Sequence, residues 1–391
     1  RKSDPSRFIQ YEGALERRFS LNEVDAYQKS QRPPEQLERF TTDIVCPMYT
    51  PIDEIVKWAE WAERTELDER PLILCEFSHA MGNSNGSLAE YFDAFHSVPA
   101  LGGGFVWDWR DQGLEEVNDD GRAYWAYGGH FGDVPNDANF CINGLTDPEG
   151  IPHPALSEFA WASRPVTVVR GDSQKIVISN RRSFMDLSDL LCHWELLING
   201  EVFKSGTLDV ELTPEEKKEF PFPASAEGAS DDEVHLAFYW QSRNDTASFK
   251  SGHIVSWDQV VLHERKEMHQ PLLIPDTEAE VGENGSYALD DISLEVNEDS
   301  SLTSISFRGK QIMSAAPTCC VWRAPTDNDG VQQGWMAEVS GIRQKWKQEG
   351  LDNVTIRNRE CDVIADDGQI LLTFRREIHG LSAFASHNSS Y

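Results

Sequence analysis

The chain has 391 residues, of which 39% are hydrophobic and 10% aromatic, and this is the composition of a folded globular protein with about two or three domains. No apolar run reaches the roughly 20 residues that a membrane-spanning helix needs. The net charge of −31 repels phosphate backbones and anionic lipids, so it argues against nucleic-acid and membrane partners but is compatible with a neutral ligand such as a sugar.

Four short apolar runs near the start of the chain predict buried parallel strands. Helices are predicted between them, one with Thr50 as N-cap before Pro51, and one with a capping-box pattern at Ser87 and Glu90. Four β/α units make half of an eightfold barrel, so residues 1–164 are predicted to form a partial TIM (β/α)8 barrel. The four runs are "RFIQYEG" (7–13), "TDIVCPMY" (42–49), "RPLILCEF" (70–77) and "LGGGFVWDW" (101–109).

The pattern changes near Val166 to strands separated by turn signals, such as "KIVISN" and an Asn199-Gly200 hairpin turn. Residues 165–272 are therefore predicted to form an immunoglobulin-like β-sandwich. An acidic linker at 275–286 leads into further strands, including "DISLEV", "SISFRG" and "QILLTFRREI". Residues 273–391 are predicted to be the first part of a larger β-domain that the chain end truncates.

The stretch "PLILCEFSHAMGNSNGS" places one carboxylate, Glu76, at the end of an apolar strand. In a β/α barrel the C-terminal ends of the strands face the active site, so a catalytic role is the natural interpretation. The alternative is a structural carboxylate that pairs with an arginine or caps the next helix. His79 and the tryptophans of "VWDWRDQ" favour a sugar site, although Trp107 and Trp109 taken alone are better explained by core packing.

The seven cysteines show no CxxC spacing, and their odd number fits reduced thiols better than disulfides or a zinc site. This favours a cytoplasmic location. The chain begins at "RKSDPSRFIQYEG" without methionine, and we expect it to be a fragment of a longer protein.

Several long motifs occur in the same order as in a known family: "PLILCEFSHAMGNSNG", "GGFVWDWRDQGL", "YGGHFGDVPNDANFCINGL", "PHPAL" and "WRAPTDNDG". They resemble the β-galactosidases of glycoside hydrolase family 2, of the lac-operon type. The resemblance covers the second half of the catalytic barrel, the sandwich that follows it and the front of the C-terminal β-domain. It implies a retaining hydrolase that releases terminal galactose from β-galactosides such as lactose.

The resemblance also implies a role for each matching residue. Glu76 matches the nucleophile, His79 a residue that stabilises the transition state, and Tyr11 a tyrosine that helps to release galactose. Trp107 matches the platform under the sugar ring, Asp137 and Asn143 match sugar-contacting positions, and the Phe140 carbonyl with Asn143 matches part of a sodium site. The structural alternatives are that Tyr11 and Phe140 are core aromatics and that Asn143 is a turn residue.

Parts of the family's catalytic apparatus have no counterpart in this sequence. The acid/base glutamate and the magnesium ligands of the family precede the point where the chain begins. The resemblance therefore implies magnesium and sodium as cofactors, but this chain would supply no magnesium ligand and only part of the sodium site. We expect the chain alone to be inactive. Glu12, Asp108, Asp111 and Glu115 lie near strand ends, but none aligns with the acid.

Two further features depart from the family pattern: a long connection at residues 14–40, which we expect on the catalytic face, and His130 where relatives commonly have Asp. Two function classes remain open. The chain is either part of a β-galactosidase, in a homo-oligomer or with a partner chain that carries the missing barrel half, or a non-catalytic carbohydrate-binding or scaffold relative.

Overall fold

The computed structural model describes residues 4–12, 42–65, 68–225, 232–264, 280–313, 315–318, 320–330, 342–366, 369–380 and 385–390. The chain divides into two compact units, Arg1–Lys266 and Glu267–Tyr391. The connection at 14–40 lies outside the described residues. No helix in the described parts of the chain is long and apolar enough to span a bilayer.

The first unit begins with a partial β/α barrel. Strand β1 (Leu72–Phe77) pairs in parallel with β2 (Leu101–Val106). On the other side of β1, the extended segment 43–49 makes isolated bridges at Val45 and Met48, and Asp43 N donates to Ile9 O at 2.7 Å. The four expected segments therefore follow one another across the sheet in chain order, as a β/α barrel requires.

Two of the four predicted strands, 7–13 and 42–49, are not regular strands in the described structure, and this part of the prediction was wrong. Side-chain chemistry explains the interruption. The Thr42 hydroxyl accepts from Tyr11 N at 3.1 Å and donates to Ile44 O at 2.8 Å, so a side chain takes over bonds that a ladder would make. Pro47 has no N–H to donate to a neighbouring strand.

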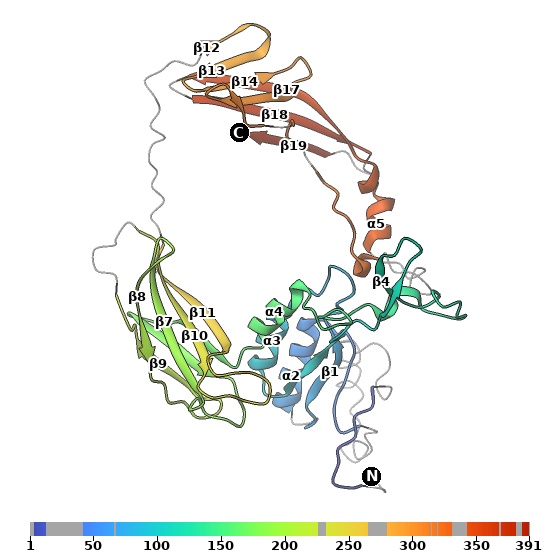
Figure 1. Ribbon diagram of the computed structural model, residues 1–391, viewed down its shortest axis with the longest axis vertical. Coiled ribbons are helices and arrows are strands. Elements are labelled where there is room, and N and C mark those ends of the chain that lie inside the picture. The colour runs from blue at the N-terminus through green and yellow to red at the C-terminus, as the bar shows by residue number, and fades with distance from the viewer. Residues whose placement is uncertain are drawn as a thin grey trace. The chain divides into compact units, whose positions relative to one another are not determined.

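Helices α2 (Ile52–Thr65), α3 (Leu88–Ser97) and α4 (Pro154–Ala162) cover β1 in Figure 1. Their apolar faces form one core with the strand, to which α2 contributes Ile55, Trp58 and Ala59. The capping predictions were not accurate. Helix α2 begins at Ile52, and Ser87 before α3 has a left-handed backbone (φ 61°) and makes no side-chain cap bond. An N-cap side chain reaches the N2 or N3 amide from an extended backbone, which Ser87 lacks.

A long excursion separates β2 from α4. It contains the two-stranded hairpin β3 (Leu114–Val117) and β4 (Ala123–Ala126) and the 3₁₀ turn η3 (Ala138–Cys141). The segment 142–146 then returns to the end of β2, where Asp108 N donates to Asn143 O at 2.6 Å and Leu145 N to Asp108 O at 2.9 Å. The excursion therefore places residues of η3 beside the C-terminal ends of the strands.

The β-sandwich follows directly in the same unit, and its strands confirm the change of pattern near Val166. A three-stranded sheet, β5-β6-β9, faces a four-stranded one, β11-β10-β7-β8, across a shared core. Asn199 and Gly200 both have positive φ (51° and 84°), as a two-residue hairpin turn requires. The strands are β5 (Val166–Arg170), β6 (Lys175–Asn180), β7 (Leu190–Ile198), β8 (Glu201–Leu208), β9 (Lys217–Pro221), β10 (Val234–Ser242) and β11 (Ile254–His263).

The second unit is mainly antiparallel β-structure with a small core around Leu294, Leu372 and Phe374. It contains a five-stranded sheet and a three-stranded sheet, together with helix α5 (Ile342–Gln348) and the 3₁₀ turns η4 (Glu283–Gly285), η5 (Asp327–Asp329) and η7 (Leu351–Asn353). The strands are β12 (Glu280–Val281), β13 (Ser286–Leu289), β14 (Ile292–Val296), β15 (Leu302–Phe307), β16 (Lys310–Gln311), β17 (Thr355–Asp366), β18 (Gln369–His379) and β19 (Ala385–Ser390).

Candidate active site

Glu76 occupies the C-terminal part of β1, and its side chain is half-buried. The segment 43–49 runs alongside β1, and Tyr49 N donates to Glu76 O at 2.9 Å. The Tyr49 side chain also hydrogen-bonds the Glu76 carboxyl. A phenol donor thus orients the one carboxylate at the end of this strand.

Burial raises the pKa of Glu76 above its ordinary value, the Tyr49 hydrogen bond opposes this effect, and the charges of Glu12 and Asp108 add to it. Burial also raises the pKa of the Tyr49 phenol, and the bond to Glu76 raises it further. Tyr49 therefore stays protonated and donates over the whole physiological range. Burial therefore disfavours the carboxylate form of Glu76, whereas the Tyr49 hydrogen bond favours that form, which is the one a nucleophile needs.

Cys75 precedes Glu76 and is a nucleophile by residue type. Burial and the charge of Glu12 raise the pKa of Cys75 to about 12, and its Sγ donates to Pro47 O at 3.5 Å. The thiolate, which is the reactive form, is therefore suppressed at neutral pH. Among the described residues the cysteines are free: Cys46, Cys75, Cys141, Cys192, Cys320 and Cys361.

His79 lies in the loop after β1, between two aromatic rings. Its imidazole centroid is 5.9 Å from that of Tyr49 in an edge arrangement and 5.7 Å from that of Phe140 on η3. The small polar residues around it support the loop itself: the Ser78 hydroxyl donates to Gly86 O at 3.0 Å, and the Ser84 hydroxyl to His79 O at 3.0 Å. These residues hold the loop that presents His79.

Trp107 follows β2 and is joined to the same loop. Its N–H donates to Phe77 O at 3.1 Å, and its carbonyl accepts from Ala80 N at 2.7 Å. The Trp107–Asp108 peptide is cis, and the Trp107 side chain is half-buried. Trp109, two residues later, is 55% exposed, so the first tryptophan of the pair is the one built into the site.

Asn143 is 2% exposed and bonded to the loop that carries Phe140. Its Nδ2 donates to Phe140 O at 2.8 Å, and its Oδ1 is buried and accepts no hydrogen bond from the described residues. A backbone carbonyl oxygen and an amide side-chain oxygen are ligand types that suit a hard cation such as sodium.

Asp137 and Tyr11, the other two predicted site residues, are more exposed. Asp137 is the residue before η3 and makes no capping bond there, and the Tyr11 ring is 54% exposed. Within the described parts of the chain, no group of three or more His, Cys, Asp or Glu side chains is placed to hold a metal ion.

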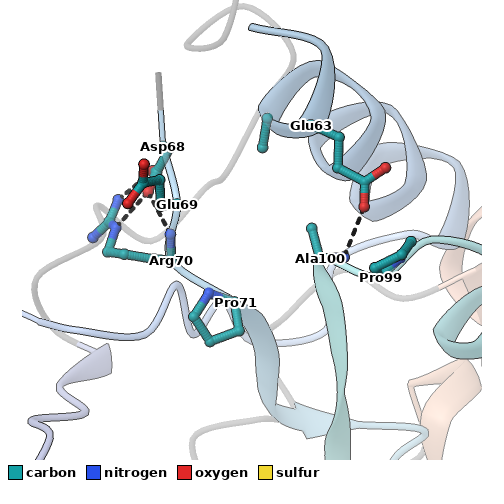
Figure 2. Close-up of a pocket in the computed structure, with 8 residues that line it drawn as sticks. Glu63, Asp68, Glu69, Arg70, Pro71, Pro99 and Ala100 are labelled. Carbon is teal, nitrogen blue, oxygen red and sulfur yellow. Dashed lines mark hydrogen bonds and ion pairs between the residues drawn. The ribbon is translucent and has the colours of Figure 1, made fainter. Parts of the chain in front are cut away.

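A cavity of about 400 Å³ lies at the opposite ends of β1 and β2, where the strands begin (Figure 2). Arg70 pairs there with Asp68 at 2.7 Å, and the Glu63 carboxylate accepts from Ala100 N at 3.1 Å. In barrels of this type the N-terminal ends of the strands serve stability, and these contacts tie α2 and the strand starts together.

Three family models match successive parts of the chain. Residues 1–168 match the TIM barrel domain of glycosyl hydrolases family 2, residues 176–263 match domain 4 of β-galactosidase, and residues 289–383 match the β-galactosidase small chain. The chain is 32% identical over 394 residues to β-galactosidase 2 of Enterobacter cloacae. Successive parts of the chain are therefore similar to successive domains of the β-galactosidases of glycosyl hydrolase family 2.

The alignment with the Enterobacter protein covers 95% of this chain and 35% of that protein, so the chain spans about a third of the length of this curated relative. Solved structures show weaker similarity. An FMN-binding β-glucuronidase from Facaelibacterium prausnitzii L2-6 is 14% identical over 60% of this chain and 34% of its own, with a TM-score of 0.23. Bacteroides uniformis β-glucuronidase 2 is 14% identical over 61% of this chain and 27% of its own, with a TM-score of 0.22.

Proposed function

We propose that Glu76 is the nucleophile of a retaining β-galactosidase that hydrolyses terminal β-D-galactose from β-galactosides such as lactose. The position of the Glu76 carboxylate carries the proposal: it lies at the catalytic end of a barrel strand, is half-buried and is hydrogen-bonded by Tyr49. A Glu76 oxygen attacks the anomeric carbon and the glycosidic C–O bond breaks, while a second carboxyl group protonates the leaving oxygen. Water then cleaves the glycosyl ester and regenerates Glu76.

The surrounding residues would hold the sugar while its ring flattens. His79, held between Tyr49 and Phe140, and the buried Asn143 would bind sugar hydroxyls, and Asp137 would reach the sugar from the start of η3. The Trp107 face would support the apolar side of the ring. Tyr11 would act in galactose release. A sodium ion held by the Phe140 carbonyl and Asn143 Oδ1 would supply a fixed positive charge for the 6-hydroxyl.

We assign the acid/base role to a glutamate outside these 391 residues. Asp111 is hydrogen-bonded to His153, and Glu115 lies on the exposed strand β3. Glu12 and Asp108 are the carboxylates whose charges act on Glu76. Without a general acid the leaving oxygen lacks its proton, a loss worth about 10²–10⁴ in rate, so we expect no turnover of a chromogenic galactoside by the purified chain alone.

The partners in this proposal are the β-galactoside and either a second copy of the chain or a partner that carries the other barrel half. The magnesium ligands would belong to that half. The exposed Phe8 and Phe105 side chains, 74% and 60% exposed at the two sides of the strand set, fit such an arrangement. The reduced cysteines support a cytoplasmic setting.

A mechanism-based label tests the proposal. The chain is fused to, or mixed with, the N-terminal portion of a family relative and treated with a 2-deoxy-2-fluoro-galactoside, which accumulates the covalent intermediate. We expect one label within residues 71–87, and we expect Glu76→Gln to abolish it. Glu12→Gln and Asp108→Asn are the controls and should retain it. Labelling at Glu12 or Asp108, or saturable sugar binding with no label at all, would favour a carbohydrate-binding or scaffold protein instead.

A further inference from the structure

We propose that Asp111 and His153 are positioning residues that hold the segment 143–146, and with it the Asn143 side chain, at the catalytic face. The proposal rests on the proposed function only for the sugar-binding role of Asn143. Asp111 follows the "VWDW" stretch after β2, and His153 immediately precedes α4. They are 42 residues apart in the chain, yet their side chains meet at 2.9 Å.

The Asp111 carboxylate divides its two oxygens between two tasks. Oδ1 accepts from the backbone N–H of Gly144 at 2.7 Å, and Oδ2 meets His153 Nε2 at 2.9 Å. Asp111 is 7% exposed and its bond to the Gly144 amide is buried, whereas the His153 side chain is 43% exposed. A carboxylate acceptor makes a stronger bond than a neutral one, and here that bond is made to the residue directly after Asn143.

Backbone bonds continue the same attachment on both sides of Gly144. Asp111 N donates to Thr146 O at 2.9 Å, and His153 N donates to Leu145 O at 2.9 Å. The segment 143–146 is therefore held between the residues after β2 and the residue before α4. The Asp111 side chain closes this set of bonds at Gly144, next to Asn143.

Gly144 shows how closely the two segments approach. A Cβ atom at this position would lie 2.2 Å from Asp111 N and 2.3 Å from the Arg110 carbonyl carbon. Both are backbone atoms and cannot rotate away. The position of the Asn143–Gly144 peptide is therefore set by its fit against residues 110–111.

A cavity with polar and apolar walls adjoins this contact. A space of about 460 Å³ is lined by Asp111, Gly144 and His153 together with Asn83 and Asn85 of the loop after β1. His153 is the N-cap residue of α4, but its side chain makes no cap bond and turns to Asp111 instead. The His153 side chain is therefore used to contact Asp111 and not to cap α4.

Hydrogen exchange of the full chain tests the proposal without requiring activity. Asp111→Ala should speed exchange of the backbone amides in 143–146 by about tenfold or more, because the Gly144 amide loses a charged acceptor, and leave β1 unchanged. Asp111→Asn keeps an acceptor oxygen for Gly144 and should restore most of the protection. His153→Ala, which leaves the Asp111 carboxylate without its partner, should have an intermediate effect.

Asp258 offers a matched control, because this buried carboxylate accepts from Val168 N at 2.8 Å and pairs with Arg164 at 2.8 Å. Asp258→Asn should affect exchange near Val168 and leave 143–146 alone. Unchanged exchange of 143–146 in Asp111→Ala, or an equal increase in Asp258→Asn, would refute the positioning role. If Asp111→Ala does not fold, the exchange of the 143–146 amides in the separate variants Asp111→Asn and His153→Ala tests the positioning role.

The reconstituted enzyme used for labelling provides the functional readout. Asp111→Ala should raise the concentration of fluorogalactoside needed for half-maximal labelling about tenfold, with little change in the labelling rate at saturation, and Asp111→Asn should restore the wild-type concentration. An unchanged half-maximal concentration contradicts the positioning of Asn143. If the wild-type protein is not labelled at Glu76, the proposed function fails, and the exchange experiment still decides the role of Asp111.

Discussion

Arg164 and Asp258 form a buried ion pair that ties the end of the barrel segment to strand β11 of the sandwich. Arg164 Nη2 lies 2.8 Å from Asp258 Oδ1, and the two side chains are 7% and 6% exposed. Asp258 Oδ2 also accepts from Val168 N on β5 at 2.8 Å, and the Arg164 guanidinium lies 3.9 Å from the Trp161 ring centroid of α4. Helix α4 and two sandwich strands thus meet at one carboxylate.

Replacing Arg164 should be strongly destabilising for this reason. Burial raises the pKa of Asp258 and Arg164 lowers it, so Arg164→Met leaves a buried carboxylate without its cation. We expect a loss of about 3–5 kcal/mol in the free energy of unfolding, measured by urea denaturation. The double variant Arg164→Met with Asp258→Asn removes the stranded charge and should recover part of the loss. A loss below about 1 kcal/mol would contradict a structural role for the pair.

Alanine substitutions at two glycines test the effect of a Cβ atom where the backbone is tightly packed and where the space is open. Gly144→Ala places a Cβ 2.2 Å from Asp111 N, and overpacking of this kind costs at least about 1–3 kcal/mol. Gly86→Ala, in the loop after β1, meets nothing within 4 Å and should leave stability nearly unchanged. Thermal unfolding of both variants and wild type gives the comparison. Equal midpoints for the two variants would be inconsistent with the described packing at Gly144.

The sandwich could be predicted closely because its signals are local. The run "KIVISN" coincides with β6, and Asn199-Gly200 supplies the two positive φ angles of a hairpin turn. The hairpin β3–β4 was not predicted. Its strands "LEEV" and "AYWA" are short, and all four residues of β3 are exposed, so no burial pattern marks them.

The grouping of the candidate site residues could be anticipated in part, because the strand-end rule predicts which face of a β/α barrel would carry a site. Glu76 led to His79 and Trp107, which the structure places around the end of β1. Tyr49 was missed, although the same rule applied to the run 42–49 would have indicated it. The bond from Asp111 to Gly144 could not be predicted, because it joins residues 33 apart through a return of the chain that sequence periodicity does not encode.

Tyr49→Phe should raise the pKa of Glu76 further, because the substitution removes the hydrogen bond that lowers it while burial and the charges of Glu12 and Asp108 remain. Carbon-detected NMR of glutamate carboxyl groups against pH measures the change, with Glu76→Gln identifying the resonance. Tyr91→Phe is the control, since the Tyr91 hydroxyl donates to Thr50 O at 3.1 Å instead. An unchanged or lower Glu76 pKa in Tyr49→Phe would show that the phenol does not stabilise the carboxylate.

Glu76→Gln should make the folded chain more stable at neutral pH, although it removes the proposed nucleophile. The pKa of Glu76 in the folded state is raised above the ordinary value of 4.5, so the folded chain disfavours the charged form. Below pH 4.5 the carboxyl is protonated in the folded and unfolded states, and the two proteins should have similar stability. As the pH rises through the folded-state pKa, wild type loses stability that the neutral glutamine retains.

Glu216→Gln provides a control of opposite sign. Backbone and side-chain hydrogen bonds from Thr213 lower the pKa of Glu216, so this carboxylate contributes stability above its unfolded pKa and loses the contribution as the pH falls. Urea unfolding at pH 4 and pH 7.5 measures the free energy of unfolding of each variant relative to wild type. As the pH rises, this difference should become more favourable for Glu76→Gln and less favourable for Glu216→Gln. If Glu76→Gln is less stable than wild type at pH 7.5, the raised pKa of Glu76 in the folded state is contradicted.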